Sequence, residues 1–173
     1  MLEYGNLSSI EFEYLCQDVI SRILGIRFIR FAPGKDGGID LQSYDRKYIV
    51  QIKHYYNSSF SDLYKSLKKE KDKLKRLSLE DYYVCVSKKL TPNNRTKIFN
   101  LFSTYMSTEK NIIDISEIDD IICDPANIDI LRKHFKLWLS SSNILNELYN
   151  QGIFIDSETL LNDVKQELPY LTI

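Results

Sequence analysis

Two short β-branched runs, close together in the sequence, constrain this chain more than any other feature. The runs Ile39–Tyr44 and Lys47–His54 are separated by a polar turn, a pattern typical of two antiparallel strands in a hairpin. Such a hairpin brings Asp40 close to the Gln51 end of the second strand. Gln51 and Lys53 are two residues apart, so their side chains lie on one face of that strand. The stretch therefore predicts an acid, an amide and a lysine at one place on a sheet.

These residue types suit a metal-dependent hydrolase. Carboxylate and carbonyl oxygens are the natural ligands of Mg²⁺, and protein sites for this ion usually contain few protein ligands. Asp40 can supply a charged ligand, the Gln51 amide a neutral oxygen, and the backbone carbonyl of Ile52 another. Lys53 can orient an attacking water or neutralise the charge that builds on a phosphate. We expect Mg²⁺ as the cofactor, with Mn²⁺ able to replace it.

A fourth candidate, Glu13, lies on the first predicted helix. Ser8 and Glu11 have the spacing of a capping box, so the helix begins near Ser8, and Gly25 is placed to end it. Glu11 thus has a structural task, whereas Glu13 lies at the edge of the apolar stripe. From there its carboxylate could lean toward the sheet and complete the outer shell of the metal through water. A surface glutamate is the alternative interpretation.

The rest of the first 124 residues alternates between strand and helix patterns. Ile26–Phe31 predicts a strand before the hairpin, and Phe60–Leu77 predicts a helix with leucines inward and lysines outward. Asp81–Ser87 predicts a buried strand, Thr91 precedes a proline that begins a helix, and Asn111–Ile115 could form a last short strand. We expect an α/β fold with a mixed sheet flanked by helices.

The character changes after Pro125, where the pattern predicts continuous helix with a high aromatic content that includes Trp138, the only tryptophan. We therefore expect a core over residues 1–124 and a helical extension or linker over residues 125–173. So apolar a helix needs a partner surface, which can be the chain's own core or another subunit.

The net charge of −1 conceals two oppositely charged segments. Residues 62–76 contain seven basic and three acidic residues, a net of +4, and residues 109–129 contain seven acids and one lysine, a net of −6. A basic segment beside the predicted site suits a polyanionic substrate, and a solvated lysine-rich helix is the alternative. The candidate nucleic-acid contacts are Lys65, Lys68, Lys69 and Tyr55.

The cysteines Cys16, Cys85 and Cys123 lack CxxC spacing and have apolar neighbours, which predicts buried thiols in a reducing compartment. The N-terminus lacks the features of a signal peptide, and no apolar run reaches the roughly 18 to 20 residues that span a bilayer. We expect a soluble, cytoplasmic protein without a membrane segment.

Three segments together resemble a known family. Phe12-Glu13 on the opening helix, Gly34–Asp40 (GKDGGID) and Gln51–Tyr55 (QIKHY) resemble the Mrr-like branch of the PD-(D/E)xK restriction-endonuclease superfamily. The resemblance covers roughly residues 8–115 and implies a PD-(D/E)xK core in which Asp40, Gln51 and Lys53 form the centre and Glu13 joins from the helix. Gln51 stands where the commoner pattern has a second acid, so this centre carries one fewer negative charge.

A finer resemblance reaches further along the chain. Arg30–Asp40, Leu90–Pro92 and His134–Ser140 resemble the N-terminal nuclease module of bacterial antiphage STAND NTPases. This implies a defence effector that a fused or partner ATPase activates by oligomerising. The chain lacks a GxxxxGK[ST] phosphate loop, because Ile29 occupies the first glycine position. It would then be an excised effector domain or a short stand-alone relative.

Together these features predict a metal-dependent endonuclease that cuts double-stranded DNA with low sequence specificity. The sequence contains no recognition helix or zinc module to read bases, and the lysine helix would contact phosphates. Cutting both strands requires two sites, so we expect a dimer or tetramer, with the Trp138 segment as a candidate interface. A non-catalytic nucleic-acid-binding or oligomerisation module and an RNase are the alternatives.

Overall fold

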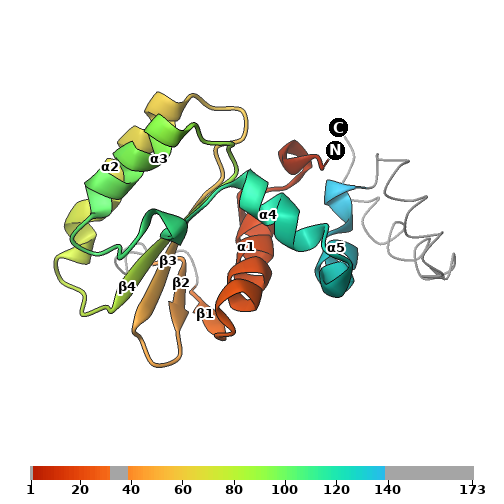
Figure 1. Ribbon diagram of the computed structural model, residues 1–173, viewed down its shortest axis with the longest axis horizontal. Helices are drawn as coiled ribbons and strands as arrows, with labels where there is room; N and C mark the ends of the chain where they lie inside the picture. Colours follow the sequence, from red (N-terminus) through yellow and green to blue (C-terminus); the bar gives the residue numbers. More distant parts are fainter. Residues whose placement is uncertain (1, 32–38, 139–173) are drawn as a thin grey trace, which may run out of the picture.

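The computed structural model describes residues 2–31 and 39–138, which form a mixed sheet flanked by helices (Figure 1). The sheet has five strands in the order of the sequence, of which β1 to β3 pair antiparallel and β3 to β5 pair parallel. The strands are β1 (Phe28–Arg30), β2 (Leu41–Ser43), β3 (Tyr48–Lys53), β4 (Asp81–Val86) and β5 (Ile112–Ile113). The predicted α/β fold with a mixed sheet is thus confirmed, although each strand is shorter than its predicted range.

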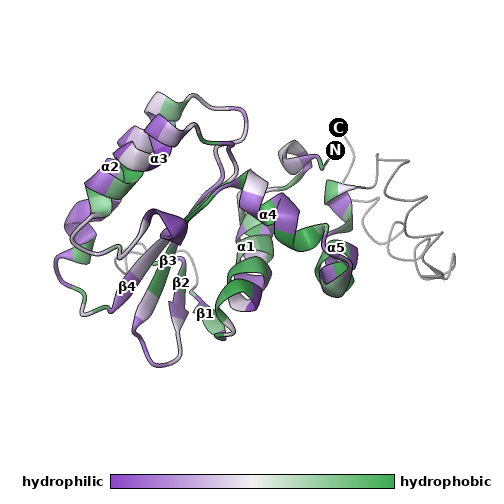
Figure 2. Ribbon diagram, viewed as in Figure 1, coloured by the Kyte–Doolittle hydropathy of each residue, from purple (hydrophilic) through white to green (hydrophobic). Residues whose placement is uncertain are grey.

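Helices cover both faces of this sheet. In Figure 1, α2 and α3 lie side by side on one side of the sheet, and α1, α4 and α5 lie on the other. The α-helices are α1 (Ser9–Leu24), α2 (Phe60–Leu74), α3 (Pro92–Phe102), α4 (Ile115–Ile122) and α5 (Ile128–Lys133). Figure 2 shows hydrophilic residues along much of α2 and hydrophobic residues along much of α1.

The first helix begins and ends where local side-chain chemistry dictates. The Ser8 hydroxyl accepts a hydrogen bond from the Glu11 amide, and the Glu11 carboxylate accepts one from the Ser8 amide at 2.7 Å. This confirms the predicted capping box. Gly25 ends the helix with φ 64°, in the left-handed region that glycine occupies without steric cost. Glu11 is also paired with Lys136 at 2.6 Å, so both oxygens of its carboxylate have a partner.

Alternation along β3 divides the interior into two cores. Val50 and Ile52 contribute to the core beneath α1 and α4, which we call the α1-side core. Ile49 points the other way, into the core beneath α2 and α3, which we call the α2-side core. Since side chains alternate along a strand, Gln51 and Lys53 share the face of Ile49. The predicted catalytic side chains of β3 therefore lie on the α2 side.

The hairpin between β2 and β3 fixes which residues of the two strands lie opposite each other. Leu41 pairs with Val50. Extending this register by one residue places Asp40 opposite Gln51. The turn is closed by a hydrogen bond of 2.9 Å from the Arg46 amide to the Ser43 carbonyl. Arg46 adopts φ 63°, and it is the one non-glycine residue with positive φ in the described chain.

The segment after Pro125 differs from the prediction of a continuous helix, which is wrong for residues 125–138. Here the chain forms a 3₁₀ turn (Pro125–Asn127), then α5, then a second 3₁₀ turn (Phe135–Leu137). Trp138 is only 1% exposed within the α1-side core, and its indole N–H donates to the Leu131 carbonyl at 2.5 Å. The chain's own core therefore covers this tryptophan, which does not support its side chain as a subunit interface. Residues 139–173 lie outside the described residues.

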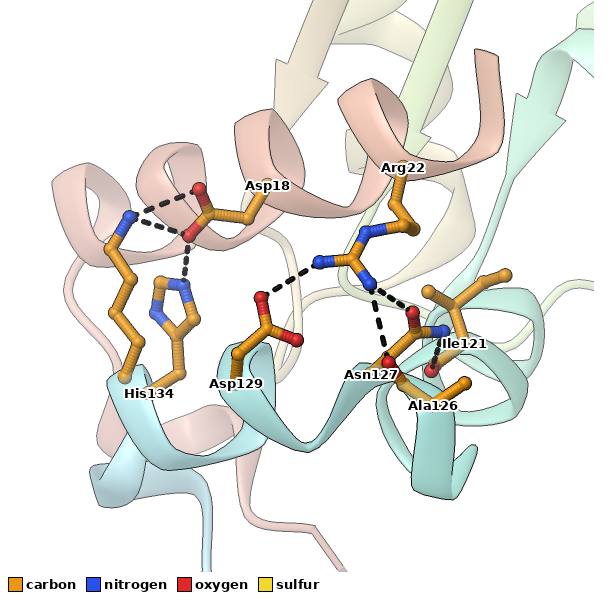
Figure 3. A network of polar contacts seen from close by, with 8 residues as sticks. Asp18, Arg22, Ile121, Ala126, Asn127, Asp129 and His134 are labelled. Atoms are coloured by element: carbon orange, nitrogen blue, oxygen red, sulfur yellow. Dashed lines mark hydrogen bonds and ion pairs between the residues drawn. The ribbon is translucent and has the colours of Figure 1, made fainter. Parts of the chain in front are cut away.

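Polar contacts fasten this segment to α1, and we call them the α1–α5 clasp (Figure 3). Asp18 accepts from the His134 ring at 2.7 Å and pairs with Lys133 at 2.8 Å. Arg22 donates to the Asn127 side chain and pairs with Asp129 at 2.7 Å. His134 follows the end of α5 and binds α1.

Two further expectations have structural outcomes. Cys16 and Cys85 are buried as predicted, but Cys123 is exposed where α4 ends, so the expectation of three buried thiols is wrong for this residue. Among the described helices, none is both long and apolar enough to cross a membrane.

Candidate active site

Asp40 is the centre of a small polar cluster at the start of β2. One oxygen of its carboxylate, Oδ2, accepts a hydrogen bond from the Gln51 side-chain amide and another, of 2.6 Å, from the Ile52 backbone amide. The proximity of Asp40 to the Gln51 end of β3 that the hairpin predicts is therefore present. The second oxygen, Oδ1, has no hydrogen-bond partner among the described residues.

The surroundings of Asp40 make its negative charge unfavourable. Burial raises the pKa of Asp40 to about 6, and the nearby carboxylates of Glu13 and Glu70 act in the same direction. The Ile52 amide and the positive charge of Lys53 oppose this rise. Ionising such a buried carboxylate costs free energy, and a cation bound beside it offsets that cost.

The donor set around Asp40 fits a hard divalent cation. The Lys53 carbonyl accepts from the Ser87 amide at 3.1 Å, on the β4 side. Carbonyls alternate along a strand, so the carbonyl of Ile52 points to the opposite side, where its own amide meets Asp40. The two ends of the Gln51 amide are interchangeable by a flip, which would turn its oxygen toward a bound cation. Asp40, Gln51 and Ile52 can thus present three oxygens together.

Lys53 forms an ion pair that the sequence did not indicate. Its ammonium donates to Glu70 on α2 at 2.9 Å, and the other oxygen of Glu70 binds Lys73 at 2.6 Å. The Glu70 position had an available signal, because Leu63, Leu67, Glu70 and Leu74 have the spacing of one buried helical stripe. An acid at a stripe position in a lysine-rich helix predicts a buried partner.

Glu13 lies apart from this cluster. It projects from α1, which packs on the other face of the sheet, and it has no hydrogen bond or ion pair among the described residues. Burial raises the pKa of Glu13, while the charges of Arg30 and Lys53 lower it. Glu13 therefore belongs to the electrostatic surroundings of Asp40 and Lys53, although it forms no hydrogen bond or ion pair with either.

The candidate nucleic-acid contacts divide into two groups. Lys65, Lys68 and Lys69 are exposed on α2, and the Lys68 ammonium lies 5.0 Å from the centre of the Tyr64 ring. Tyr55 is half-buried against the α2-side core, with its backbone amide bound to the Ser87 hydroxyl at 2.7 Å. The lysines are accessible to a polyanion, and Tyr55 is a packing residue with a partly exposed ring.

His54 is a packing residue. Its ring stacks on Phe12 with centroids 5.0 Å apart, and Nε2 lies 2.8 Å from the Leu7 carbonyl. The ring therefore ties β3 to the start of α1 on the face opposite Lys53.

Part of the predicted motif lies outside the described residues. Gly34, Lys35, Asp36, Gly37 and Gly38 belong to this part, and only Ile39 and Asp40 of the GKDGGID run are described. Within the described chain, no three His, Cys, Asp or Glu side chains come together as a metal-binding group. The candidate centre has a different composition, since it relies on one carboxylate supplemented by amide and backbone oxygens.

Comparison with known proteins gives one relative of unknown activity. Protein y4cD of Sinorhizobium fredii (strain NBRC 101917 / NGR234), described as uncharacterized, is 26% identical to this chain over 153 residues. The match covers 87% of this chain and 24% of that protein, so the chain spans about a quarter of its relative's length. No family model and no solved structure matches the chain.

Proposed function

We propose that this chain is a metal-dependent endonuclease domain with a PD-(D/E)xK-type core, which hydrolyses phosphodiester bonds of double-stranded DNA. The observation that carries the proposal is the contact of Asp40 with both Gln51 and Ile52, with Lys53 two residues further on the same strand face. The resemblance of GKDGGID and QIKHY to Mrr-like nucleases supports this assignment of roles.

Asp40, the Gln51 amide and the Ile52 carbonyl would hold the cation, Mg²⁺ or Mn²⁺, with Glu13 reaching it through water. When bound, a divalent ion supplies a Lewis acid for the scissile phosphate and lowers the pKa of a bound water. Gln51 is neutral, so Asp40 provides the one formal charge among the three inner ligands. We therefore expect weak cation binding in the absence of the substrate phosphate.

Lys53 carries the positive charge of the site. It follows the metal ligands on β3, and an ammonium has three N–H donors, of which Glu70 accepts one. The remaining donors are available to a water molecule or to a phosphate oxygen. In this role Lys53 orients the attacking water or stabilises charge on the phosphate as the bond breaks.

The exposed lysines of α2 support a nucleic-acid substrate. Lys65, Lys68 and Lys69 project from the helix that also supplies Glu70 to Lys53, so a polyanion bound along α2 would lie beside the site. Contacts of this kind bind phosphates and carry no base information. The expected specificity is therefore for the backbone rather than for a sequence.

We further propose that the domain acts within a larger assembly as an antiphage effector. The resemblance to the nuclease modules of STAND NTPases supports this, and the relative y4cD is a much longer protein. A dimer or tetramer would bring two centres to the two DNA strands. A fused or partner ATPase would then control cleavage by controlling assembly.

Supercoiled plasmid provides the direct test. Wild-type protein with Mg²⁺ should convert it to nicked and linear forms, whereas Asp40→Ala and Lys53→Ala should leave it supercoiled. The protein is assayed alone and fused to an oligomerising partner, because isolated effector domains can be inactive. Equal inactivity of wild type and both variants under every condition, with Mg²⁺ and with Mn²⁺, would rule out the nuclease.

A non-catalytic nucleic-acid-binding module is the second candidate. The neutral Gln51 and the two protein donors already bound to Asp40 favour it, since both weaken a cation site. In that case the chain would bind DNA without cutting it and would bind equally well after Asp40→Ala. The same assay with RNA in place of plasmid tests the RNase alternative.

A further inference from the structure

Glu70 is an exception on its own helix. The helix α2 carries five lysines and is largely solvated, yet the side chain of Glu70 is only 10% exposed. It occupies the buried stripe formed by Leu63, Leu67 and Leu74, where an apolar residue would cost nothing in desolvation. A charged residue at such a position requires a partner inside the protein.

That partner is Lys53. The two side chains meet at 2.9 Å and are 15% and 10% exposed, so water covers little of either charged group. Burial alone would raise the pKa of Glu70, but the hydrogen bonds from Lys53 and Lys73 outweigh it and hold the pKa below its ordinary value. Glu70 is therefore an ionised acceptor at the end of the Lys53 side chain.

A lysine ammonium that must stay in one place needs such an acceptor. The ammonium ends a flexible four-carbon stem, and β3 fixes only the direction in which the stem leaves the strand. Asp40 binds Gln51 and Ile52 and has no hydrogen bond to Lys53. Among the described residues, Glu70 is the one side chain that binds the Lys53 ammonium.

We infer that Glu70 is the positioning residue for Lys53, which anchors its ammonium beside Asp40 and couples helix α2 to the site. The inference rests on the proposed function for its catalytic consequence, but not for the anchoring itself. It also provides a charge balance. Gln51 is neutral where the commoner pattern has an acid, and Glu70 on α2 supplies a negative charge instead. That charge binds Lys53 and does not add a ligand for the cation.

A purely structural ion pair is the competing explanation. Removing Glu70 would then lower stability and leave the order of Lys53 and the turnover of folded enzyme unchanged. The two explanations therefore differ in two measurable properties, the mobility of the Lys53 side chain and kcat per folded molecule.

The experiment compares Glu70→Gln with Asp72→Asn. Asp72 lies on the same helix and pairs with Lys75 at 2.8 Å, but its side chain is 78% exposed, so it is a matched carboxylate–lysine pair in solvent. Mobility is measured by NMR on protein with ¹³C-labelled lysine, with the Lys53 ε-methylene signal assigned by its absence in Lys53→Arg. Turnover and KM are measured on plasmid with Mg²⁺.

We expect the Lys53 ε-methylene to be ordered in wild type and Asp72→Asn and mobile in Glu70→Gln. Misplacement of a catalytic group by an ångström can cost about 100-fold, so kcat should fall ~100-fold in Glu70→Gln with KM within about threefold. Glu70→Asp, which keeps the charge, should recover most of the loss. If Glu70→Gln does not fold, Glu70→Met, which fills the position without a charge, takes its place with the same expectation.

The outcomes separate the two proposals. An ordered Lys53 in Glu70→Gln, or in Glu70→Met where only that variant folds, would overturn the inference. If wild-type protein leaves DNA intact while the Lys53 side chain becomes mobile in Glu70→Gln, the nuclease proposal fails and the anchoring of Lys53 by Glu70 is supported. If Glu70→Gln cleaves DNA at the wild-type rate, Lys53 needs no anchor for catalysis, and the nuclease proposal is retained.

Discussion

The two faces of the sheet each carry a network of acids and cations, and the networks differ in how much water reaches them. On the α2 side, Lys53 and Glu70 are 15% and 10% exposed. In the α1–α5 clasp, Arg22 and Asp129 are 40% and 65% exposed. Both networks join segments distant in sequence, and both pair carboxylates with basic side chains. Their surroundings therefore decide what each can do.

An exposed pair is screened by water and contributes up to about 1 kcal/mol to stability. A buried pair is costly to form, and loss of one partner leaves an uncompensated charge that costs about 3–5 kcal/mol. The exposed Arg22–Asp129 pair thus fits an attachment contact that can be lost singly, whereas the Asp18–His134 contact of the clasp is mostly buried. The Lys53–Glu70 pair fits a precisely placed charge, such as a catalytic site uses.

Removal of the charges at the site should have the largest effect on activity. Asp40→Asn and Lys53→Met are expected to lower kcat on plasmid by about 10³-fold or more, because charge stabilisation at the phosphate is the largest catalytic contribution. Asp18→Asn in the clasp is the matched acid on the other face, and it should retain wild-type turnover when folded. An equal loss in all three variants would show that the two networks do not differ in function.

Removal of the apolar contact beneath the clasp should have the largest effect on stability. Trp138→Ala is expected to cost about 3–5 kcal/mol in the free energy of unfolding, since it empties a core position and leaves the Leu131 carbonyl unpaired. Urea denaturation measures this loss. Tyr44→Ala, at an exposed aromatic residue, is the control and should change stability by about 0.5 kcal/mol or less. Similar losses in both variants would contradict the burial of Trp138.

A polar contact of the clasp should contribute less and should depend on pH. Asp18→Asn is expected to cost about 1–2 kcal/mol at pH 7, because Asp18 accepts hydrogen bonds from His134 and Lys133. Burial raises the pKa of Asp18, but these two hydrogen bonds outweigh it and the pKa lies below its ordinary value.

The sign of the pH dependence follows from that lowered pKa. The stabilisation by Asp18 is complete above the ordinary aspartate pKa of about 3.9 and declines as the pH falls toward the folded value. Denaturation of wild type and Asp18→Asn between pH 7 and pH 3 should therefore give curves that converge in acid. A constant difference across this range would show that the Asp18 charge does not contribute.

The smallest expected effect concerns the exposed lysines of α2. Each lysine that contacts a phosphate should reduce the slope of log K against log salt by about 1 when it is replaced by glutamine. Lys65→Gln, Lys68→Gln and Lys69→Gln are each titrated with duplex DNA at several salt concentrations. Lys110→Gln, at an exposed lysine in the acidic part of the chain, is the control. Slopes unchanged in all three variants would place the DNA elsewhere.

The features that the sequence predicted well depend on residues close together in the chain. The capping box joins Ser8 to Glu11, and the hairpin joins strands across a short turn, so both follow from local rules. The contact of Asp40 with Gln51 is a direct consequence of that hairpin. By the same reasoning, the Asp114 capping box with Glu117 could have indicated α4, where a strand ending at Ile115 was predicted.

Features that depend on distant packing were not predictable in the same way. The stripe spacing marks Glu70 as a buried acid, but only the position of Lys53 on β3 identifies its partner. The aromatic content around Trp138 indicated a partner surface, either the chain's own core or another subunit, and only the packing shows that the core covers it. The helix that carries Glu13 was predicted correctly, but no local rule could place the Glu13 carboxylate relative to residues on the opposite face of the sheet.

The turn between β2 and β3 has a consequence for which changes the chain can tolerate. Exposed loops usually accept insertions. Here one inserted residue that shifted the strands would set Asp40 against a neighbour of Gln51 and direct its side chain away from Lys53. Arg46, with φ 63°, lies in this turn, and the length of the turn sets the register that places Asp40 opposite Gln51. In an evolving lineage, lengthening this surface turn could therefore separate Asp40 from Lys53.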